Sequence, residues 1–583
     1  MAYEDSPGAN EGVDVSMGDT LDDLREAYDY LEMPVRKYLV VVLFPSVVFF
    51  VATVLLVLAV DLPLMIALPI PLLGLLGVVT AAIYPKLVIE QERQELENRL
   101  HLLITHMTVL STTKIDRMEV FRRLGQEDEY RALADEINRV VQLVDTWNQS
   151  LDDALRRRAQ QVPSKPLSDF FDRLAYTMGA GQELSDFLLS EQSVIIQNYV
   201  TVYESSLGNL EVMKDLYLSM ILSMSFALVF AVVLPVLTGT DPTMTVAAVI
   251  VMFVFVQTGF FMAIRSITPY DPVWYLADEI DPRAEPRLRK ALGAGVVLSV
   301  FLLVVVLADV MGANPVPLAT LLPTPTVPLP IYAALPITPL LIPGLTIRGM
   351  ESDIKDRDQG FPSFIRALGA AESAKQSTTS AVLSDLRGKD FGALTEDVNN
   401  LFKRLNMRIE PSKAWKYFAA DTQSYLIQKF SEMYLVGRQM GGEPKLLGEL
   451  ISANMNEVNQ LRERRKQATI TLIGVLYGIT AAATFAFFIG IEIVNMISNM
   501  SVDLSAGNSA AGQIINTAAY DIPVVEGLLV LVILFNALLS SLMIRTVDGG
   551  HKLNAYLHFV ALSWIGAIIG VVTRYVVSTL IAV

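Results

Sequence analysis

The chain has 583 residues, of which 52% are hydrophobic, and its mean hydropathy of +0.44 is too apolar for a water-soluble protein of this length. It contains no cysteine, so disulfides, thiolate catalysis and cysteine metal sites are excluded. Its formal charge is −16 at pH 7. Such acidity, with more arginine than lysine, is typical of a high-salt cytoplasm and indicates a halophilic archaeon; an ordinary acidic protein is the alternative.

The N-terminal segment 1–38 is acidic and lacks the basic region and apolar run of a signal peptide. A capping-box pattern that begins at Thr20 precedes apolar residues at helical spacing, which predicts a short amphipathic helix. Arg36 and Lys37 come just before the first apolar stretch, and they favour a cytoplasmic N-terminus.

Nine apolar stretches follow, each about the 20 residues needed to cross a hydrocarbon core of about 30 Å. We therefore predict an all-α polytopic membrane protein with nine transmembrane helices. The sixth stretch is rich in proline, which a spanning helix tolerates only where neighbouring helices or water satisfy the freed carbonyls. The predicted spans are 39–60, 64–84, 216–237, 243–265, 290–311, 317–343, 468–496, 523–543 and 556–580.

The loops between these spans differ in charge. Short internal turns carry arginine, as at Arg265, Arg287 and Arg545, whereas the external segments contain neither lysine nor arginine. This asymmetry satisfies the positive-inside rule and places the C-terminus outside. The external segments are 61–63, 238–242, 312–316 and 497–522.

Three charged residues fall at a similar depth near the outer ends of the last three spans. They are Glu492, Glu526 and Arg574. Because a charge inside the bilayer costs roughly 2.5–3.5 kcal/mol on insertion scales, we predict an intramembrane ion cluster. The alternative is that each side chain reaches the outer interface separately.

Two long polar segments interrupt the spans, and both read as helical. Residues 88–113 continue the second span, and 448–466 run directly into the seventh. The predicted division is 1–38 acidic cytoplasmic segment, 39–84 transmembrane hairpin, 85–214 first cytoplasmic domain, 215–345 four-helix transmembrane region, 346–467 second cytoplasmic domain, and 468–583 three-helix transmembrane region.

The two cytoplasmic segments resemble each other. Ala154 and Phe171 are 17 residues apart and precede Gly179-Ala180-Gly181; Ala414 and Phe430 are 16 apart and precede Gly441-Gly442. We predict a duplicated helical-bundle domain.

The two segments differ in charge. Residues 85–214 have 15 basic and 21 acidic residues, a net −6, whereas residues 346–467 have 19 and 16, a net +3. The positive segment favours an acidic partner. The candidate partner contacts are Arg156, Arg157, Arg158, Arg462, Arg464, Arg465 and Lys466. For the run 156–158, a solvated helix face is the alternative. For the four residues in 462–466, contact with anionic lipid headgroups is the alternative.

The chain lacks the motifs of common enzymes. It has no G-x-x-x-x-G-K-[ST], H-E-x-x-H or G-x-S-x-G sequence, so we expect no catalytic site, cofactor or metal. His101 and His106 are five residues apart and are expected in the core. A polytopic transporter or channel is the rival of another class, but the first six spans contain few mid-depth charges of the kind that coupled transporters use.

This layout resembles the type II secretion system F domain family, the membrane platforms of type II secretion systems, type IV pili and archaella. The similarity lies in the segments around Phe171 and Phe430 with the glycines that follow them, and it covers about 88–496. The spans before and after each copy are typical of the archaeal, archaellum-type branch. A platform for archaeal adhesion pili is the alternative.

The resemblance implies a mechanism without catalytic residues. Such a platform is expected to sit in the cell membrane as a homodimer at the filament base, with lipids around it. A separate hexameric secretion-type ATPase docks on its cytoplasmic domains, and filament subunits (archaellins or pilins) are lifted from the membrane. No nucleic acid enters this mechanism.

Overall fold

The structure is a computed structural model that describes residues 35–59, 69–113, 115–275, 284–312, 327–375, 379–506 and 521–581. In these residues the chain is helical, and their only β-bridge is an isolated one between Trp274 and Ser424. The all-α class is therefore confirmed for this part of the chain. The amphipathic helix predicted after Thr20 lies outside the described residues.

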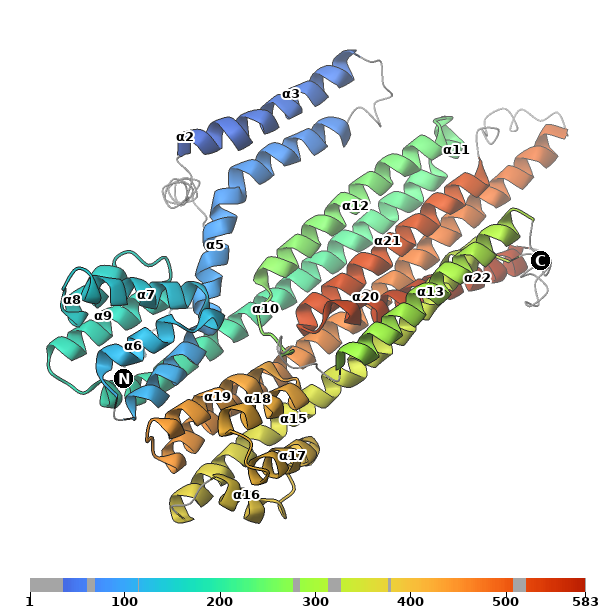
Figure 1. Cartoon of the computed structure of the whole chain (residues 1–583). Coiled ribbons are helices and arrows are strands. Elements are labelled where there is room, and N and C mark those ends of the chain that lie inside the picture. The colour runs from blue at the N-terminus through green and yellow to red at the C-terminus, as the bar shows by residue number, and fades with distance from the viewer. Residues whose placement is uncertain are drawn as a thin grey trace, which may run out of the picture.

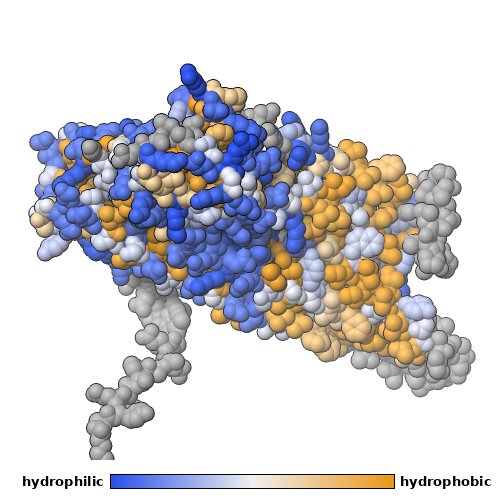
Figure 2. Space-filling view, turned by 90° about the horizontal axis from the view of Figure 1, so that it is seen from below, coloured by the Kyte–Doolittle hydropathy of each residue, from blue (hydrophilic) through white to orange (hydrophobic). Residues whose placement is uncertain are grey.

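Seven helices of the described chain are long and apolar enough to cross a membrane. They coincide with the third to ninth predicted spans, and Figure 2 shows apolar surface over one end of the molecule and polar surface over the other. The chain is therefore a multi-pass membrane protein. These helices are α10 Leu184–Val233, α12 Pro242–Ile267, α13 Ala284–Val310, α14–α15 Leu329–Lys375, α20 Pro444–Ala506, α21 Ile522–Asp548 and α22 Ala555–Ile581.

A helical hairpin occupies the positions of the first two predicted spans. It packs apolar α3 Phe44–Ala59 against the start of α5 Pro69–Ser111, and Tyr38 donates a hydrogen bond to Ala81 O at 2.6 Å. The hairpin stands apart from the other membrane helices (Figure 1). Preceding α3 are α2 Val35–Tyr38 and the π-helix η1 Leu39–Leu43. The total of nine spans stays a prediction.

The proline-rich sixth span is a broken helix. After α14 Leu329–Ala334, the chain forms the 3-10 helix η4 Leu335–Leu340, in which Pro339 is internal, and then continues as α15 Leu341–Lys375. Proline lacks the amide hydrogen that an α-helix needs, which accounts for the local change of hydrogen bonding. Nearby, Trp564 of α22 donates to Thr338 Oγ1 at 2.9 Å and anchors the irregular segment.

The polar end of the molecule contains two helical clusters. The first lies between α5 and α10, and the second between α15 and α20 (Figure 1). One hydrophobic core runs through both clusters, from Leu96 to Val458. The first cluster consists of α6 Arg117–Gly125, η2 Asp128–Tyr130, α7 Ala132–Asp145, α8 Leu151–Ala159 and α9 Lys165–Gly179. The second consists of α16 Thr379–Leu386, η5 Gly392–Leu394, α17 Thr395–Asn406, α18 Pro411–Thr422 and α19 Tyr425–Gln439.

The two histidines expected in the core are buried in α5. His101 and His106 are 3% and 4% exposed. Burial lowers the pKa of both imidazoles to about 3, so both rings are neutral at physiological pH. His101 stacks on Tyr199 and His106 contacts the Tyr130 hydroxyl at 3.1 Å, which are packing roles.

A pair of glycines brings α15 and α20 into backbone contact. A Cβ atom at Gly448 would lie 2.8 Å from Ile365 O, and one at Gly369 would clash with Pro444 O. No side chain fits between the two helices at this crossing, so their spacing is set by main-chain atoms.

Replacing Gly448 by alanine should force this crossing apart. The expected loss is about 1–3 kcal/mol, which is typical of overpacking a tight core. Thermal unfolding in detergent measures it as a lowered Tm. Gly349→Ala in α15 is the matched control, because a Cβ there meets nothing within 4 Å and alanine favours the helix. Equal Tm values for the two variants would contradict the close crossing.

Candidate coupling site

A short loop ties the membrane helices to the second cluster. Residues 268–275 follow α12, and their main chain pairs with the turn between α18 and α19. Tyr275 N donates to Gln423 O at 2.9 Å, and Tyr425 N donates to Val273 O at 3.1 Å. The loop is therefore fixed to the cluster by its backbone as well as by the side chains that follow.

Arg462 of α20 is the centre of a buried ion-pair cluster. Its Nε and Nη2 donate to the two carboxylate oxygens of Asp271 at 2.8 and 2.6 Å, and its Nη1 donates to Asp358 Oδ2 at 2.6 Å. The three side chains are 11%, 7% and 2% exposed. Since Asp271 lies in the loop and Asp358 in α15, one guanidinium group joins three elements with a geometry that lysine does not offer.

The two carboxylates of this cluster differ in pKa. Burial raises the pKa of Asp358 to about 6, although Arg462 opposes the shift. Burial acts on Asp271 in the same direction, but its bidentate pairing with Arg462 outweighs it, so the pKa of Asp271 is lowered. Asp271 therefore keeps its charge firmly, whereas Asp358 takes up a proton near pH 6.

Glu351 of α15 forms a second junction, with the turn between α21 and α22. Trp274 Nε1 donates to Glu351 at 3.0 Å, Asn554 Nδ2 donates at 2.9 Å, and the main-chain N–H of His551 also donates to this carboxylate. Burial raises the pKa of Glu351. A Cβ at Gly550 would lie 2.6 Å from both carboxylate oxygens, so this turn needs glycine there.

Arg465 of α20 binds the end of α21. Its Nε donates to Val547 O at 2.5 Å and its Nη2 donates to Thr546 O at 3.2 Å. A cation suits the C-terminal carbonyls of a helix, which carry partial negative charge. Gly549 ends the helix with φ +78°, in the left-handed region, and a Cβ there would meet the Arg465 guanidinium group at 2.8 Å.

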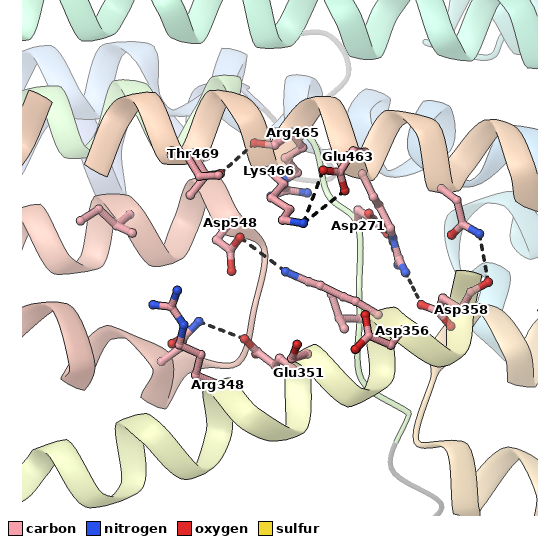
Figure 3. A pocket seen from close by; sticks show the side chains of 18 of the residues that line it. Asp271, Arg348, Glu351, Asp356, Asp358, Glu463, Arg465, Lys466, Thr469 and Asp548 are labelled. Atoms are coloured by element: carbon pink, nitrogen blue, oxygen red, sulfur yellow. Dashed lines mark hydrogen bonds and ion pairs between the residues drawn. The ribbon is translucent and has the colours of Figure 1, made fainter. Parts of the chain in front are cut away.

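These groups surround a polar cavity of about 240 Å³ at the base of the membrane helices (Figure 3). The labelled side chains project into it from α15, α20, the loop and α21. Lys355 reaches from α15 to Asp548 of α21, with 3.5 Å between Nζ and Oδ1. Charges of both signs line the cavity, and the described residues hold no group of three metal-ligating side chains. The arrangement links helices through opposite charges.

The seven basic residues predicted as partner contacts separate into exposed and internal groups. Arg156 and Arg157 are exposed on α8. Arg158 is directed inward and donates to Glu136 at 2.6 and 3.1 Å. Only the first two are therefore free to meet another protein from this helix.

The four basic residues predicted near the seventh span divide in the same way. Arg462 and Arg465 are internal links of the coupling site, not surface groups. Arg464 and Lys466 are exposed and pair with Glu204 and Glu463.

Near the opposite end of the membrane helices, Arg574 of α22 lies between two glutamates. Its Nε donates to Glu492 of α20 at 3.0 Å, and its Nη2 donates to Glu526 of α21 at 2.8 Å. Both glutamate side chains are 12% exposed and that of Arg574 is 35% exposed. One cation thus joins three helices.

Asp271, Glu351 and Asp358 were not among the predicted site residues, although the sequence contains a signal for two of them. The buried face of α15 runs through Ile347, Ile354 and Phe361. Glu351 and Asp358 lie on this same face, where a carboxylate requires a buried partner. Carboxylates that interrupt an apolar helix face therefore identify the site.

Arg462→Met should strongly destabilise the protein, because it leaves Asp271 and Asp358 buried without their cation. Breaking a buried pair in this way costs about 3–5 kcal/mol. The neighbouring Arg464→Met is the control, since an exposed pair contributes about 1 kcal/mol or less. Thermal unfolding in detergent compares them; an Arg462→Met Tm no lower than that of the control would show that the cluster is dispensable.

The raised pKa of Asp358 predicts a pH dependence. Between pH 4 and 6 the folded protein holds a proton at Asp358 that the unfolded chain, with an ordinary pKa of 3.8, does not. This group therefore adds stability as pH falls from about 7 to 4, and its contribution to the slope fades above about pH 7. Asp358→Asn should abolish this part of the Tm–pH profile, and an unchanged slope in the variant would contradict it.

Exchanging charges tests the Arg574 cluster. Arg574→Met leaves two glutamates without their cation within the membrane. It should lower Tm, because each unpaired charge costs roughly 2.5–3.5 kcal/mol there. Arg574→Glu combined with Glu492→Arg restores the opposite charges, and we expect partial recovery relative to Arg574→Glu alone. A double variant no more stable than that single variant would argue against pairing.

The comparisons with known proteins agree with this architecture. The family model described as type II secretion system (T2SS), protein F, matches residues 103–234. The chain is 33% identical over 514 residues to flagella accessory protein J of Methanocaldococcus jannaschii, and 33% identical over 514 residues to that of Methanococcus voltae. Each alignment covers 88% of this chain and 90% of the relative. No solved structure matches the chain significantly.

The matched T2SS segment contains the whole of the first cluster and α10, and each relative aligns with 88% of the chain. The chain therefore belongs to the flagella accessory protein J family, which shares the F domain of the type II secretion system.

Proposed function

We propose that the chain is the membrane platform of an archaellum, a type IV pilus-like filament machine. A separate hexameric ATPase docks on the polar helical clusters, and the platform passes its conformational work to filament subunits and to any rotation of the filament. The chain itself is not an enzyme in this scheme. Membership of the flagella accessory protein J family supports the archaellum, and a platform for adhesion pili is the alternative.

The observation that carries this proposal is the continuity of two helices. α10 and α20 contain 50 and 63 residues, and each runs unbroken from the polar end through an apolar segment. At about 1.5 Å per residue they extend roughly 75 and 95 Å. A displacement of the clusters therefore reaches the far side of the membrane without crossing a flexible joint.

We assign the polar end to the cytoplasm. Arg265 lies in the last turn of α12, at the polar end, and Asp241 caps the same helix at its other end. This distribution supports a cytoplasmic N-terminus and an external C-terminus under the positive-inside rule. With the α3–α5 hairpin counted, the proposed topology has nine spans and the domain division predicted from the sequence. Arg464 and Lys466 then lie near lipid headgroups.

We also propose that the two clusters are copies of one unit. Residues with matching roles lie 260 positions apart: Ser164 and Ser424 cap α9 and α19, and Gly181 and Gly441 follow these helices with φ +80° and +85°. The same interval separates two residues with positive φ in the turns before α8 and α18, Asn148 and Arg408. This register pairs Phe170, rather than Phe171, with Phe430.

The proposed ATPase contact is the exposed pair Arg156 and Arg157 on α8. Reversing both charges to glutamate should reduce co-purification of the ATPase with the platform, because two exposed cations would be replaced by anions at the contact. Arg117→Glu, at an exposed position of α6 in the same cluster, is the control. Retention of the ATPase at the level of the control would remove α8 from the contact.

A gene deletion in cells tests which filament the platform serves. Deletion of the gene should abolish swimming and leave surface attachment intact if the platform assembles an archaellum. Loss of attachment with normal swimming would assign it to an adhesion pilus. Normal swimming and attachment, with substrate flux in vesicles that contain the protein, would instead favour the transporter class.

A further inference from the structure

The second cluster buries a face of α19, whereas the corresponding face of α9 in the first cluster is exposed. In α19, Lys429 and Met433 are 3% and 0% exposed, and the helix packs on α5 and reaches η2 through Lys429. Lys429 pairs with Glu129 and lies 5.5 Å from the centre of the Tyr130 ring. This face of α19 is the contact between the second cluster and the first.

The same contact is tight further along α19. A Cβ at Gly437 would lie 2.8 Å from Val109 of α5. The two helices therefore touch with little intervening side chain.

In the part of the chain that the structure describes, no other element covers the matching face of α9. At the interval of 260, the counterparts of Lys429, Met433 and Gly437 are Asp169, Arg173 and Thr177. Asp169 and Arg173 are exposed, Thr177 is half-buried, and the adjacent Tyr176 is 78% exposed. In Figure 1, α8 and α9 lie at an edge of the polar end away from α16 and α17.

The face of α5 that receives α19 also differs in burial from its counterpart on α15. Leu103 and Met107 of α5 match Phe364 and Leu368 of α15 at an interval of 261, and all four are fully buried. In this register, the α5 residues that lie toward the second cluster correspond to exposed residues of α15. The buried residues are Leu102, Thr105 and Val109, and their exposed counterparts are Ser363, Arg366 and Ala370.

Among the described residues, both halves of a contact are thus open, while the equivalent contact occurs once. We propose that the α9 face of one copy packs on the α15 face of a second copy, as α19 packs on α5 within a copy. The contact joins two different surfaces, and a two-fold symmetric dimer would contain it twice. It rests on the repeat proposed above and is independent of the filament served.

Charge supports a second copy as the occupant. The open α9 face carries Asp169 and Arg173, of which Arg173 is paired with Glu191 of α10. The open α15 face carries Arg366, so Asp169 is the charge that remains to meet it. The segments that contain them, 85–214 and 346–467, have net charges of −6 and +3, so they attract each other. Both faces are more polar than the α19–α5 contact, which is typical of an association that can dissociate.

Cysteine cross-linking tests the contact directly, because the chain has no native cysteine. Full-length Thr177→Cys and Ala370→Cys, with different affinity tags, are combined in one membrane and oxidised. We expect a disulfide-linked pair that carries both tags, since the counterparts of these positions, Gly437 and Val109, touch within the chain. Thr177→Cys combined with Met407→Cys, at a 67% exposed position of the second cluster, is the control.

Three results would overturn the proposal: no mixed product although both thiols react with maleimide, equal cross-linking to Met407→Cys, or links only between two Thr177→Cys chains. Charge reversal adds a second readout. Asp169→Lys should reduce the yield severalfold, and Arg366→Asp in the other population should restore it. The cross-linking experiment requires only the platform protein. A negative result therefore does not affect the ATPase and filament proposals, and failure of those proposals does not affect this contact.

Discussion

The architecture depends on the buried pairing of Arg462 with Asp271 and Asp358. Three charged groups have been removed from water, and each is tolerated only because the others are in place. The cluster therefore fixes the loop 268–275, α15 and α20 in a single arrangement. Glu351 and Arg465 extend the same constraint to the turn between α21 and α22, and two adjacent glycines leave room for both side chains. Helices far apart in sequence thus meet at one polar junction beneath the membrane segments.

Around this junction the molecule offers few places to bend. α15 and α20 touch through main-chain atoms at Gly369 and Gly448, the two clusters share one hydrophobic core, and α10 and α20 continue into the apolar region. Force applied to the clusters is thus transmitted by packed helices. The α3–α5 hairpin is the exception, because it stands apart from the other membrane helices (Figure 1). This division suits a platform whose cytoplasmic part is moved by another protein.

Sequence reasoning succeeded where a local pattern determines the structure. Apolar length located the third to ninth spans, and helical periodicity predicted the continuity of α20. Local patterns do not reveal distant partners: the basic run predicts a surface position for Arg462, because nothing near it in sequence shows Asp271, 191 residues away, as its partner. The repeat remains a proposal, and its register differs by one residue between the motif, which pairs Phe171 with Phe430, and the proposed interval of 260, because a weak motif does not fix helix ends. The prolines of the sixth span indicate that freed carbonyls need other partners, but they do not predict the 3-10 helix that forms there.

Hydrogen exchange across the loop 268–275 tests the central claim most directly. The amides of Tyr275 and Tyr425 are bonded across the junction, so in the intact protein they should exchange as slowly as amides within α20. In Arg462→Met they should exchange much faster, while amides in the apolar part of α20 remain protected. Rapid exchange of Tyr275 and Tyr425 in the unaltered protein would contradict the account, because the junction would then open without loss of its cation.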